Sequence, residues 1–115
     1  MEITDANITV MVTDMEVSVN FYQMLGLTLK QRWENHYAML TAPGVVIGLH
    51  PSEAIPSSKQ VSIGLMVADI NEAKKLLDEQ EVNYVFDDGK SGAYLHFTDP
   101  DGTVLYYTQP KWNYD

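Results

Sequence analysis

The chain has 115 residues, a length that suits one compact domain, and its 45% content of hydrophobic residues is ordinary for a globular protein. The formal net charge of −9 at pH 7 argues against a nucleic-acid-binding surface, since no basic stripe is present to contact phosphates. The absence of cysteine excludes disulfides, thiolate metal sites and thiol nucleophiles.

The sequence also bears on location and partners. Its first residues, Met-Glu-Ile-Thr-Asp-Ala, have neither the basic segment nor the apolar segment of a secretory signal. No apolar run approaches the roughly 18 residues that a membrane-spanning helix requires. We therefore expect a cytoplasmic protein with no membrane and no nucleic-acid partner, whose acidic charge favours neutral or cationic ligands.

The first half of the chain predicts one strand, one helix and three further strands. Ile8, Val10 and Val12 alternate with Asn7, Thr9 and Met11, the period of a half-buried strand. Asp14 is placed to cap the following helix, and Gly26 is placed to end it. Short strands are then expected at Leu27 to Trp33, Tyr37 to Thr41 and Val45 to His50.

The second half predicts the same order of elements. A strand is expected from Val61 to Val67, followed by Asp69 as the cap of a second helix. The segment from Asp99 to Gly102, Asp-Pro-Asp-Gly, is expected to turn the last hairpin, because Pro fixes φ and Gly permits a positive φ. The three strands around this turn are expected at Asn83 to Asp87, Ala93 to Thr98 and Thr103 to Gln109.

The two halves are related by a sequence repeat. Ile8-Thr-Val-Met-Val-Thr-Asp14 returns 55 residues later as Ile63-Gly-Leu-Met-Val-Ala-Asp69. We therefore predict a single domain, residues 1–115, built from two βαβββ modules, because either half alone is too small to be stable. Module one spans about 7–50 and module two about 60–109, with a linker at 51–59 and a C-terminal tail at 110–115.

This pattern resembles a known superfamily. The segment from Val12 to Leu27, Val-Thr-Asp-Met-Glu-Val-Ser-Val-Asn-Phe-Tyr-Gln-Met-Leu-Gly-Leu, looks like the first strand–helix unit of the vicinal oxygen chelate superfamily. The two capping aspartates and the Asp-Pro-Asp-Gly turn agree with it. Members include glyoxalase I, extradiol dioxygenases, fosfomycin-resistance enzymes and bleomycin-resistance proteins. The resemblance covers about residues 7–109.

The resemblance implies an α+β fold in which each module curls a mixed sheet into a half-barrel around a central cavity, with the helices outside. Ile8, Val10 and Val12 would then face a helix, and the residues between them the cavity. The expected ligand cavity is lined by Asn7, Thr9, Met11, Trp33, Tyr37, Gly48, His50, Ser62, Met66, Tyr94, His96 and Tyr106.

The superfamily's metal ligands come from the first and last strand of each module. Carried onto this chain, these positions fall on Asn7, Gly48, Ser62 and Tyr106. The set contains no imidazole and no carboxylate, so it offers a divalent ion none of its preferred ligands. We therefore expect no metal and no other cofactor, and this expectation places glyoxalase, dioxygenase and fosfomycin chemistry in doubt together.

Three histidines and the aromatic residues are the remaining candidates for a functional role. His50 has two interpretations, a cavity acid or base and a strand-end histidine bonded to backbone; His96 is either a cavity or a sheet-surface residue, and His36 is expected to be solvated. Trp33 and the tyrosines either wall a pocket for a flat organic ligand or fill the half-barrel as core. His50 and Tyr106 are the candidate catalytic residues, should catalysis occur.

Three functions follow from these interpretations. The first is a metal-independent protein that binds or sequesters a small organic molecule, similar to the bleomycin-resistance branch and expected to be a homodimer. The second is a glyoxalase-like lyase, isomerase or dioxygenase that uses an atypical metal site or metal-free acid–base catalysis. The third is an interaction module without a ligand, so the sequence leaves open whether the protein is an enzyme.

Overall fold

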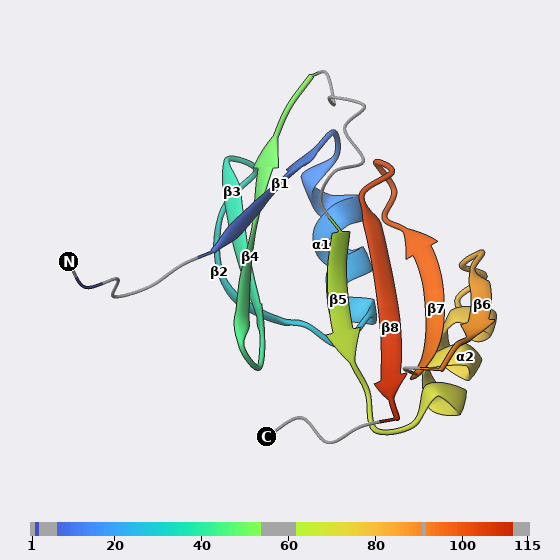
Figure 1. The fold of residues 1–115 in the computed structure, drawn as a ribbon. Helices are drawn as coiled ribbons and strands as arrows, with labels where there is room; N and C mark the ends of the chain where they lie inside the picture. Colours follow the sequence, from blue (N-terminus) through green and yellow to red (C-terminus); the bar gives the residue numbers. More distant parts are fainter. Residues whose placement is uncertain (1, 3–6, 54–61, 91, 112–115) are drawn as a thin grey trace. The chain divides into compact units, whose positions relative to one another are not determined.

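The computed structural model describes residues 2, 7–53, 62–90 and 92–111 (Figure 1). The chain divides into two compact units, Met1–Ser57 and Ser58–Asp115, which correspond to the two predicted modules. Most of the predicted linker at 51–59 and most of the predicted tail at 110–115 lie outside the described residues. No helix in the described part of the chain is long and apolar enough to cross a lipid bilayer.

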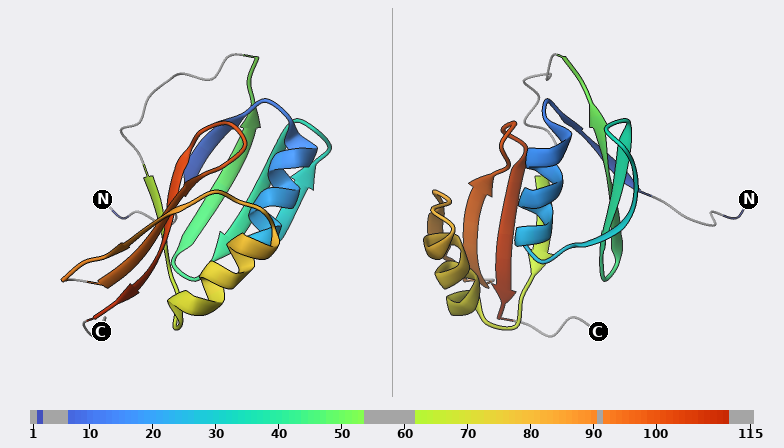
Figure 2. Two further views of the ribbon diagram at one scale, coloured as in Figure 1. Left: turned by 90° about the vertical axis from the view of Figure 1, so that its right-hand side faces the viewer. Right: turned by 180° about the vertical axis from the view of Figure 1, so that it is seen from behind.

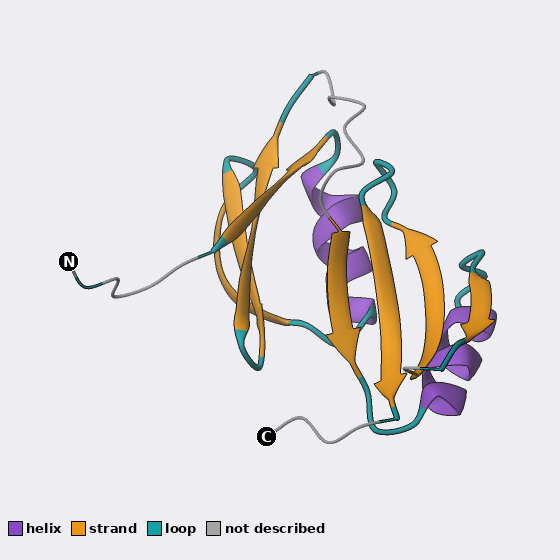
Figure 3. Cartoon of the chain, in the orientation of Figure 1, coloured by secondary structure: helices purple, strands orange, loops and turns teal. Residues whose placement is uncertain are grey.

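Each unit has the predicted βαβββ order, so the α+β fold of two such modules is confirmed (Figure 3). The first consists of β1 (Ile8–Val12), α1 (Met15–Met24), β2 (Thr28–Trp33), β3 (Tyr37–Ala42) and β4 (Val45–Pro51). The second consists of β5 (Ser62–Met66), α2 (Ile70–Glu79), β6 (Val85–Asp88), β7 (Gly92–Thr98) and β8 (Val104–Pro110).

Both units form an open mixed sheet with the same topology. The strand orders are β1-β4-β3-β2 and β5-β8-β7-β6, in which the first strand pairs in parallel with the last and the other pairs are antiparallel. Thr9 pairs with Gly48 in one sheet, and Gly64 pairs with Tyr106 in the other. The first and last strands of each module are therefore neighbours, as the resemblance implied.

The capping residues that the sequence predicts begin both helices. The Asp14 carboxylate accepts a hydrogen bond from the Val17 N–H (3.1 Å), and Asp69 accepts one from the Asn71 N–H (2.9 Å). Such bonds satisfy backbone donors that have no partner within the helix. Gly26 follows α1 with a φ of 113°, a conformation that favours glycine.

Each helix covers one face of its own sheet (Figure 2). Val10 and Val12 are buried on that side in the first unit, as are Leu40, Ile47 and Leu49 of the same sheet. Thr9 and Met11, between the buried valines, are exposed. The predicted alternation is therefore confirmed from Thr9 to Val12, while Ile8 at the strand end remains 38% exposed.

The core of the second unit includes a tyrosine whose ionisation is coupled to folding. Tyr107 on β8 is buried, and this desolvation raises its pKa from 10.0 to about 12. Between these pH values the unfolded chain releases a proton that the folded chain retains, so the free energy of unfolding falls as pH rises. A difference of one in pKa corresponds to about 1.4 kcal/mol. The rise from 10.0 to about 12 therefore lowers the free energy of unfolding by at most about 3 kcal/mol at high pH.

Urea unfolding of the wild type and Tyr107→Phe between pH 9 and pH 12 measures this loss. We expect stability to fall less steeply above pH 10 in the variant, because it lacks the titrating hydroxyl. Equal slopes in the two proteins would show that Tyr107 does not cause the dependence.

Candidate functional site

Each sheet has a second face that its helix does not cover, here called the open face. Residues directly opposite one another in a ladder project to the same side of a sheet. In the first unit the ladder places Thr9 beside Gly48, Gly48 beside Met39, and Met11 beside His50. Thr9, Met11, Gly48 and His50 are positions that the sequence assigned to a ligand cavity, and the ladders bring them together on one surface of one module; Met39 was not among the expected residues.

An aromatic cluster lies on the open face of the first unit and consists of Trp33, Tyr37 and His50. The Tyr37 ring centroid lies 5.8 Å from that of Trp33 and 6.4 Å from that of His50. The Tyr37 phenol lies directly over Gly48, in the space that a Cβ atom at this position would require. Gly48 therefore allows the ring to lie against the sheet.

The second unit carries an aromatic cluster of Tyr94, His96 and Tyr106 on its own open face. Tyr94 and His96 are stacked, with an interplanar angle of 13° and centroids 5.8 Å apart. The Tyr106 ring lies 5.9 Å from each of them and covers Gly64, where a Cβ would again overlap the phenol. The two clusters thus share one design, in which a tyrosine ring lies over a glycine of the neighbouring strand.

The ladders also show a repeat pair that the sequence analysis did not identify. Met39 pairs with Gly48 and His96 with Tyr106, so Tyr37 and Tyr94, each two residues earlier, occupy equivalent positions 57 residues apart. The same offset relates Thr41 to Thr98. Comparison of the two Tyr-x-x-x-Thr segments at this offset would have revealed the pair.

The four positions that the resemblance assigns to metal ligands do not fit a divalent ion. Asn7 and Ser62 are exposed at the beginning of the first strands, Gly48 lies beneath Tyr37, and Tyr106 presents a phenol in place of a carboxylate. Among the described residues, no three His, Asp or Glu side chains are grouped so as to hold a metal. Without an imidazole or a carboxylate, this set lacks the ligands that first-row divalent ions select.

The histidines differ in their surroundings. The His50 Nδ1 atom lies 2.8 Å from the Pro51 carbonyl oxygen, so Nδ1 donates and Nε2 is left as an acceptor. This bond agrees with the strand-end interpretation of His50, although its ring also belongs to the first cluster. His96 belongs to the second cluster. His36 is exposed, and its Nε2 lies 4.0 Å from Glu34, as expected of a solvated residue.

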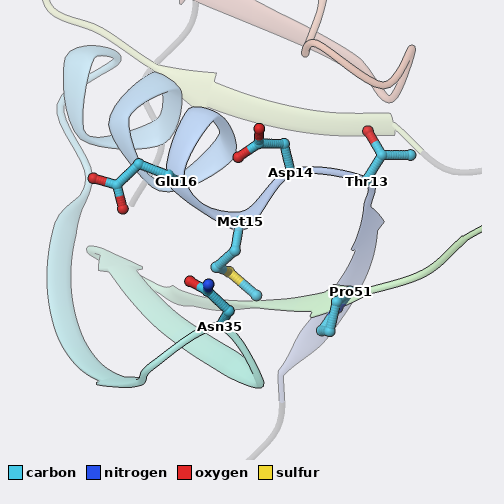
Figure 4. Close-up of a pocket in the computed structure, with 6 residues that line it drawn as sticks. All are labelled: Thr13, Asp14, Met15, Glu16, Asn35 and Pro51. Carbon is cyan, nitrogen blue, oxygen red and sulfur yellow. The ribbon is translucent and has the colours of Figure 1, made fainter.

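A separate hollow of about 300 Å³ lies where β1 ends and α1 begins (Figure 4). Met15 points from the start of α1 toward Asn35 and Pro51 in this view. Arg32 holds two wall residues in place, since its guanidinium donates to Glu16 Oε2 (2.7 Å) and Asn35 Oδ1 (2.8 Å). The residues around this hollow are Thr13, Asp14, Met15, Glu16, Asn35 and Pro51.

Sequence reasoning did not find this hollow. Arg32 and Asn35 come from β2 and the following turn, whereas Glu16 lies in the first turn of α1. No spacing or motif in the sequence links these residues. A second hollow of about 410 Å³ involves Thr13, Pro51, Ser52 and Glu53, so Thr13 and Pro51 line both hollows.

Comparison with known proteins identifies the family of this scaffold. The model of the Glyoxalase/Bleomycin resistance protein/Dioxygenase superfamily matches residues 6–106. The chain belongs to this superfamily. The resemblance that the capped helices and the Asp-Pro-Asp-Gly turn indicated is therefore confirmed.

Solved structures of the superfamily share the fold at low sequence identity. A bleomycin-binding protein in complex with bleomycin aligns with a TM-score of 0.74 and 17% identity, over 95% of this chain and 100% of that one. The bleomycin resistance determinant encoded on transposon Tn5 gives a TM-score of 0.75 at 17% identity, over 96% and 100%.

A third structure, the fosfomycin resistance protein FosX from Listeria monocytogenes, gives a TM-score of 0.82 at 14% identity, over 96% of both chains. No curated protein matches the chain in sequence. At these identities the likeness extends to the fold and does not by itself assign a ligand or a reaction.

Proposed function

We propose that this member of the superfamily binds a flat, bulky organic molecule without the help of a metal ion. One observation carries the proposal. In both modules a tyrosine ring lies over a glycine at the paired first and last strands, where metal-dependent members would place their ligands. Tyr37 occupies the space above Gly48, and Tyr106 is itself the residue at a ligand position.

The chemistry of the open faces supports this class of ligand. Aromatic rings form flat, apolar surfaces that stack with other rings, each contact contributing about 0.5–1.5 kcal/mol beyond area burial. Met11 and Met66 flank the clusters and are 39% and 53% exposed. Methionine adapts its shape to irregular ligands, and exposed apolar patches on soluble proteins often mark binding sites.

The structural neighbours are consistent with this proposal. Two of the neighbours are described as binding bleomycin or conferring resistance to it, and both have this fold over nearly their whole length. We extend to this chain only the general property, the capture of an organic molecule larger than a simple metabolite. The expected homodimer and cytoplasmic location belong to the same proposal.

A second candidate function is metal-free acid–base catalysis at His50. The Pro51 carbonyl accepts a hydrogen bond from Nδ1 of this imidazole, so in the neutral ring Nε2 is the nitrogen that can act as a base. The Tyr37 ring lies edge-on to His50, with the ring centroids 6.4 Å apart. Recovery of a bound molecule unchanged after long incubation would favour binding over catalysis.

Nuclear magnetic resonance titration of ¹⁵N-labelled protein tests the proposal with two probes, naphthalene as a minimal flat ligand and metal-free bleomycin as a large one. We expect shifts at amides of the two aromatic clusters, with the same affinity in the presence of EDTA. Trp33→Ala and Tyr106→Ala should each weaken binding about tenfold, the loss of one stacking contact.

Phe86→Ala provides the matched control. Phe86 is 48% exposed, but it pairs with the buried Leu95 and its ring lies 5.7 Å from the Lys74 Nζ atom of α2, on the helix side of the sheet. Its removal should leave both affinities unchanged. Binding that requires an added divalent ion, or that is weakened equally by the control, would contradict the proposal.

A further inference from the structure

We infer that the first module recognises a neutral, planar aromatic molecule that carries a carbonyl oxygen, and that the Tyr37 hydroxyl donates a hydrogen bond to this oxygen. The inference rests on the proposed function and assigns the chemical class of its ligand. It is carried by three features of the open face, which are a pair of hydroxyl groups, a glycine that positions one of them, and the lack of carboxylates, lysines and arginines among the described residues that the ladders place around them on this face.

The hydroxyl groups of Thr9 and Tyr37 form the polar centre of this face. Thr9 Oγ1 and Tyr37 Oη lie 3.4 Å apart, and either can be the donor. Each group has one O–H donor and two acceptor lone pairs. When the Thr9 hydroxyl donates to the Tyr37 oxygen, the Tyr37 O–H is left to donate to an acceptor on a ligand.

Gly48 fixes the position of the phenol. Because the ring occupies the space of a missing Cβ, it lies against the β4 backbone rather than extending into solvent. Trp33 lies beside it with its ring plane tilted by 46°. A ligand ring that stacks on the indole would therefore meet the Tyr37 hydroxyl at its edge. Because this hydroxyl is already held in place, little conformational entropy is lost on binding.

The lack of charged side chains at the paired positions around Thr9 and Tyr37 determines which acceptor group of a ligand this face favours. The side chains that the ladders place on this face near Tyr37 are Thr9, Met11, Gln31, Trp33, Met39, Gly48 and His50. None is a carboxylate, which would bind an ammonium group, and none is lysine or arginine, which would bind a carboxylate or phosphate. A neutral carbonyl is the acceptor that such a surface favours, and the net charge of −9 also disfavours anions.

Two probes of similar shape test the inference. Coumarin and naphthalene are both fused two-ring molecules, but only coumarin carries a carbonyl oxygen. Their affinities for wild type, Tyr37→Phe and Tyr84→Phe are measured by ¹⁵N titration. Tyr37→Phe keeps the ring and removes the hydroxyl, whereas Tyr84 donates to Asp78 elsewhere and controls for loss of any phenol.

We expect Tyr37→Phe to weaken coumarin binding about three- to tenfold, the range for one net hydrogen bond, and to leave naphthalene binding unchanged. Tyr84→Phe should change neither. If both probes bind but Tyr37→Phe affects them equally or not at all, the inference is wrong and the proposed function stands. If neither probe binds the wild type, the inference fails; if metal-free bleomycin does not bind either, the proposed function fails as well.

Discussion

Replacement of Leu40 by alanine is expected to lower the free energy of unfolding by about 3 kcal/mol. Leu40 lies in the middle of β3, pairs with Leu29 and Ile47, and is fully buried on the side of the sheet that α1 covers. Truncation of a large side chain there removes apolar contacts and leaves a cavity. Urea denaturation followed by circular dichroism measures the change.

Met39→Ala is the matched control, since Met39 is the preceding residue and lies on the open face beside Gly48. It is only partly buried, so its truncation should cost less than about 1 kcal/mol. Comparing the two losses distinguishes the hypothesis of a binding protein from that of a ligand-free interaction module whose interior is filled by its own side chains. An equal loss in the two variants would show that the open face is a structural core.

The second large effect is expected at Asp99. This carboxylate is 4% exposed, and its Oδ1 atom accepts hydrogen bonds from the backbone N–H groups of Asp101 (2.9 Å) and Thr103 (2.8 Å). The turn is closed further by the bond from the Asp99 N–H to the Thr103 carbonyl (2.9 Å). Asp99→Ala leaves two N–H groups without this acceptor, and we expect a loss of about 3 kcal/mol.

The conservative variant Asp99→Asn keeps an oxygen at the Oδ1 position and removes the charge. The loss in free energy of unfolding should be at most half of that in Asp99→Ala, because a neutral amide oxygen still accepts hydrogen bonds from both N–H groups. Thermal and urea unfolding of the three proteins measure the series. A loss in Asp99→Asn as large as in Asp99→Ala would indicate that the charge, rather than the turn geometry, is what this residue contributes.

The architecture of the chain was predictable from its sequence because the determinants are local. The strand from Ile8 to Val12 has a period of two, Asp14 and Asp69 are short acceptors at helix starts, and the segment from Asp99 to Gly102 has turn chemistry. The strand limits were less accurate, since each expected strand differs from the observed one by one or two residues at one or both ends. β6 begins at Val85 rather than Asn83, since Glu81 adopts a positive φ of 57° after α2 and the strand starts later.

The candidate site was predictable only in part, for a physical reason. Alternation along a strand determines which residues share a face, so the sequence predicted that Gly48 and His50 lie on the same surface. The direction of a ring depends instead on the neighbours that leave room for it. The position of Tyr37 over Gly48, and of Tyr106 over Gly64, follows from packing between strands, which no motif records.

The hollow at the start of α1 shows the same limit more strongly. It depends on Arg32, which contacts Glu16 of α1 and Asn35 of the β2–β3 turn, and these three residues come from separate elements. The partners of a long charged side chain are determined by the folded backbone. Composition and spacing give no information about such contacts.

The metal content of the purified protein tests the central claim most directly. The measurement is native mass spectrometry combined with elemental analysis, on protein prepared without chelators and then dialysed against zinc, nickel or ferrous iron. Because Asn7, Gly48, Ser62 and Tyr106 supply no imidazole and no carboxylate, we predict no stoichiometric metal before or after dialysis. One tightly bound ion per chain, lost on substitution of Tyr106, would contradict this account.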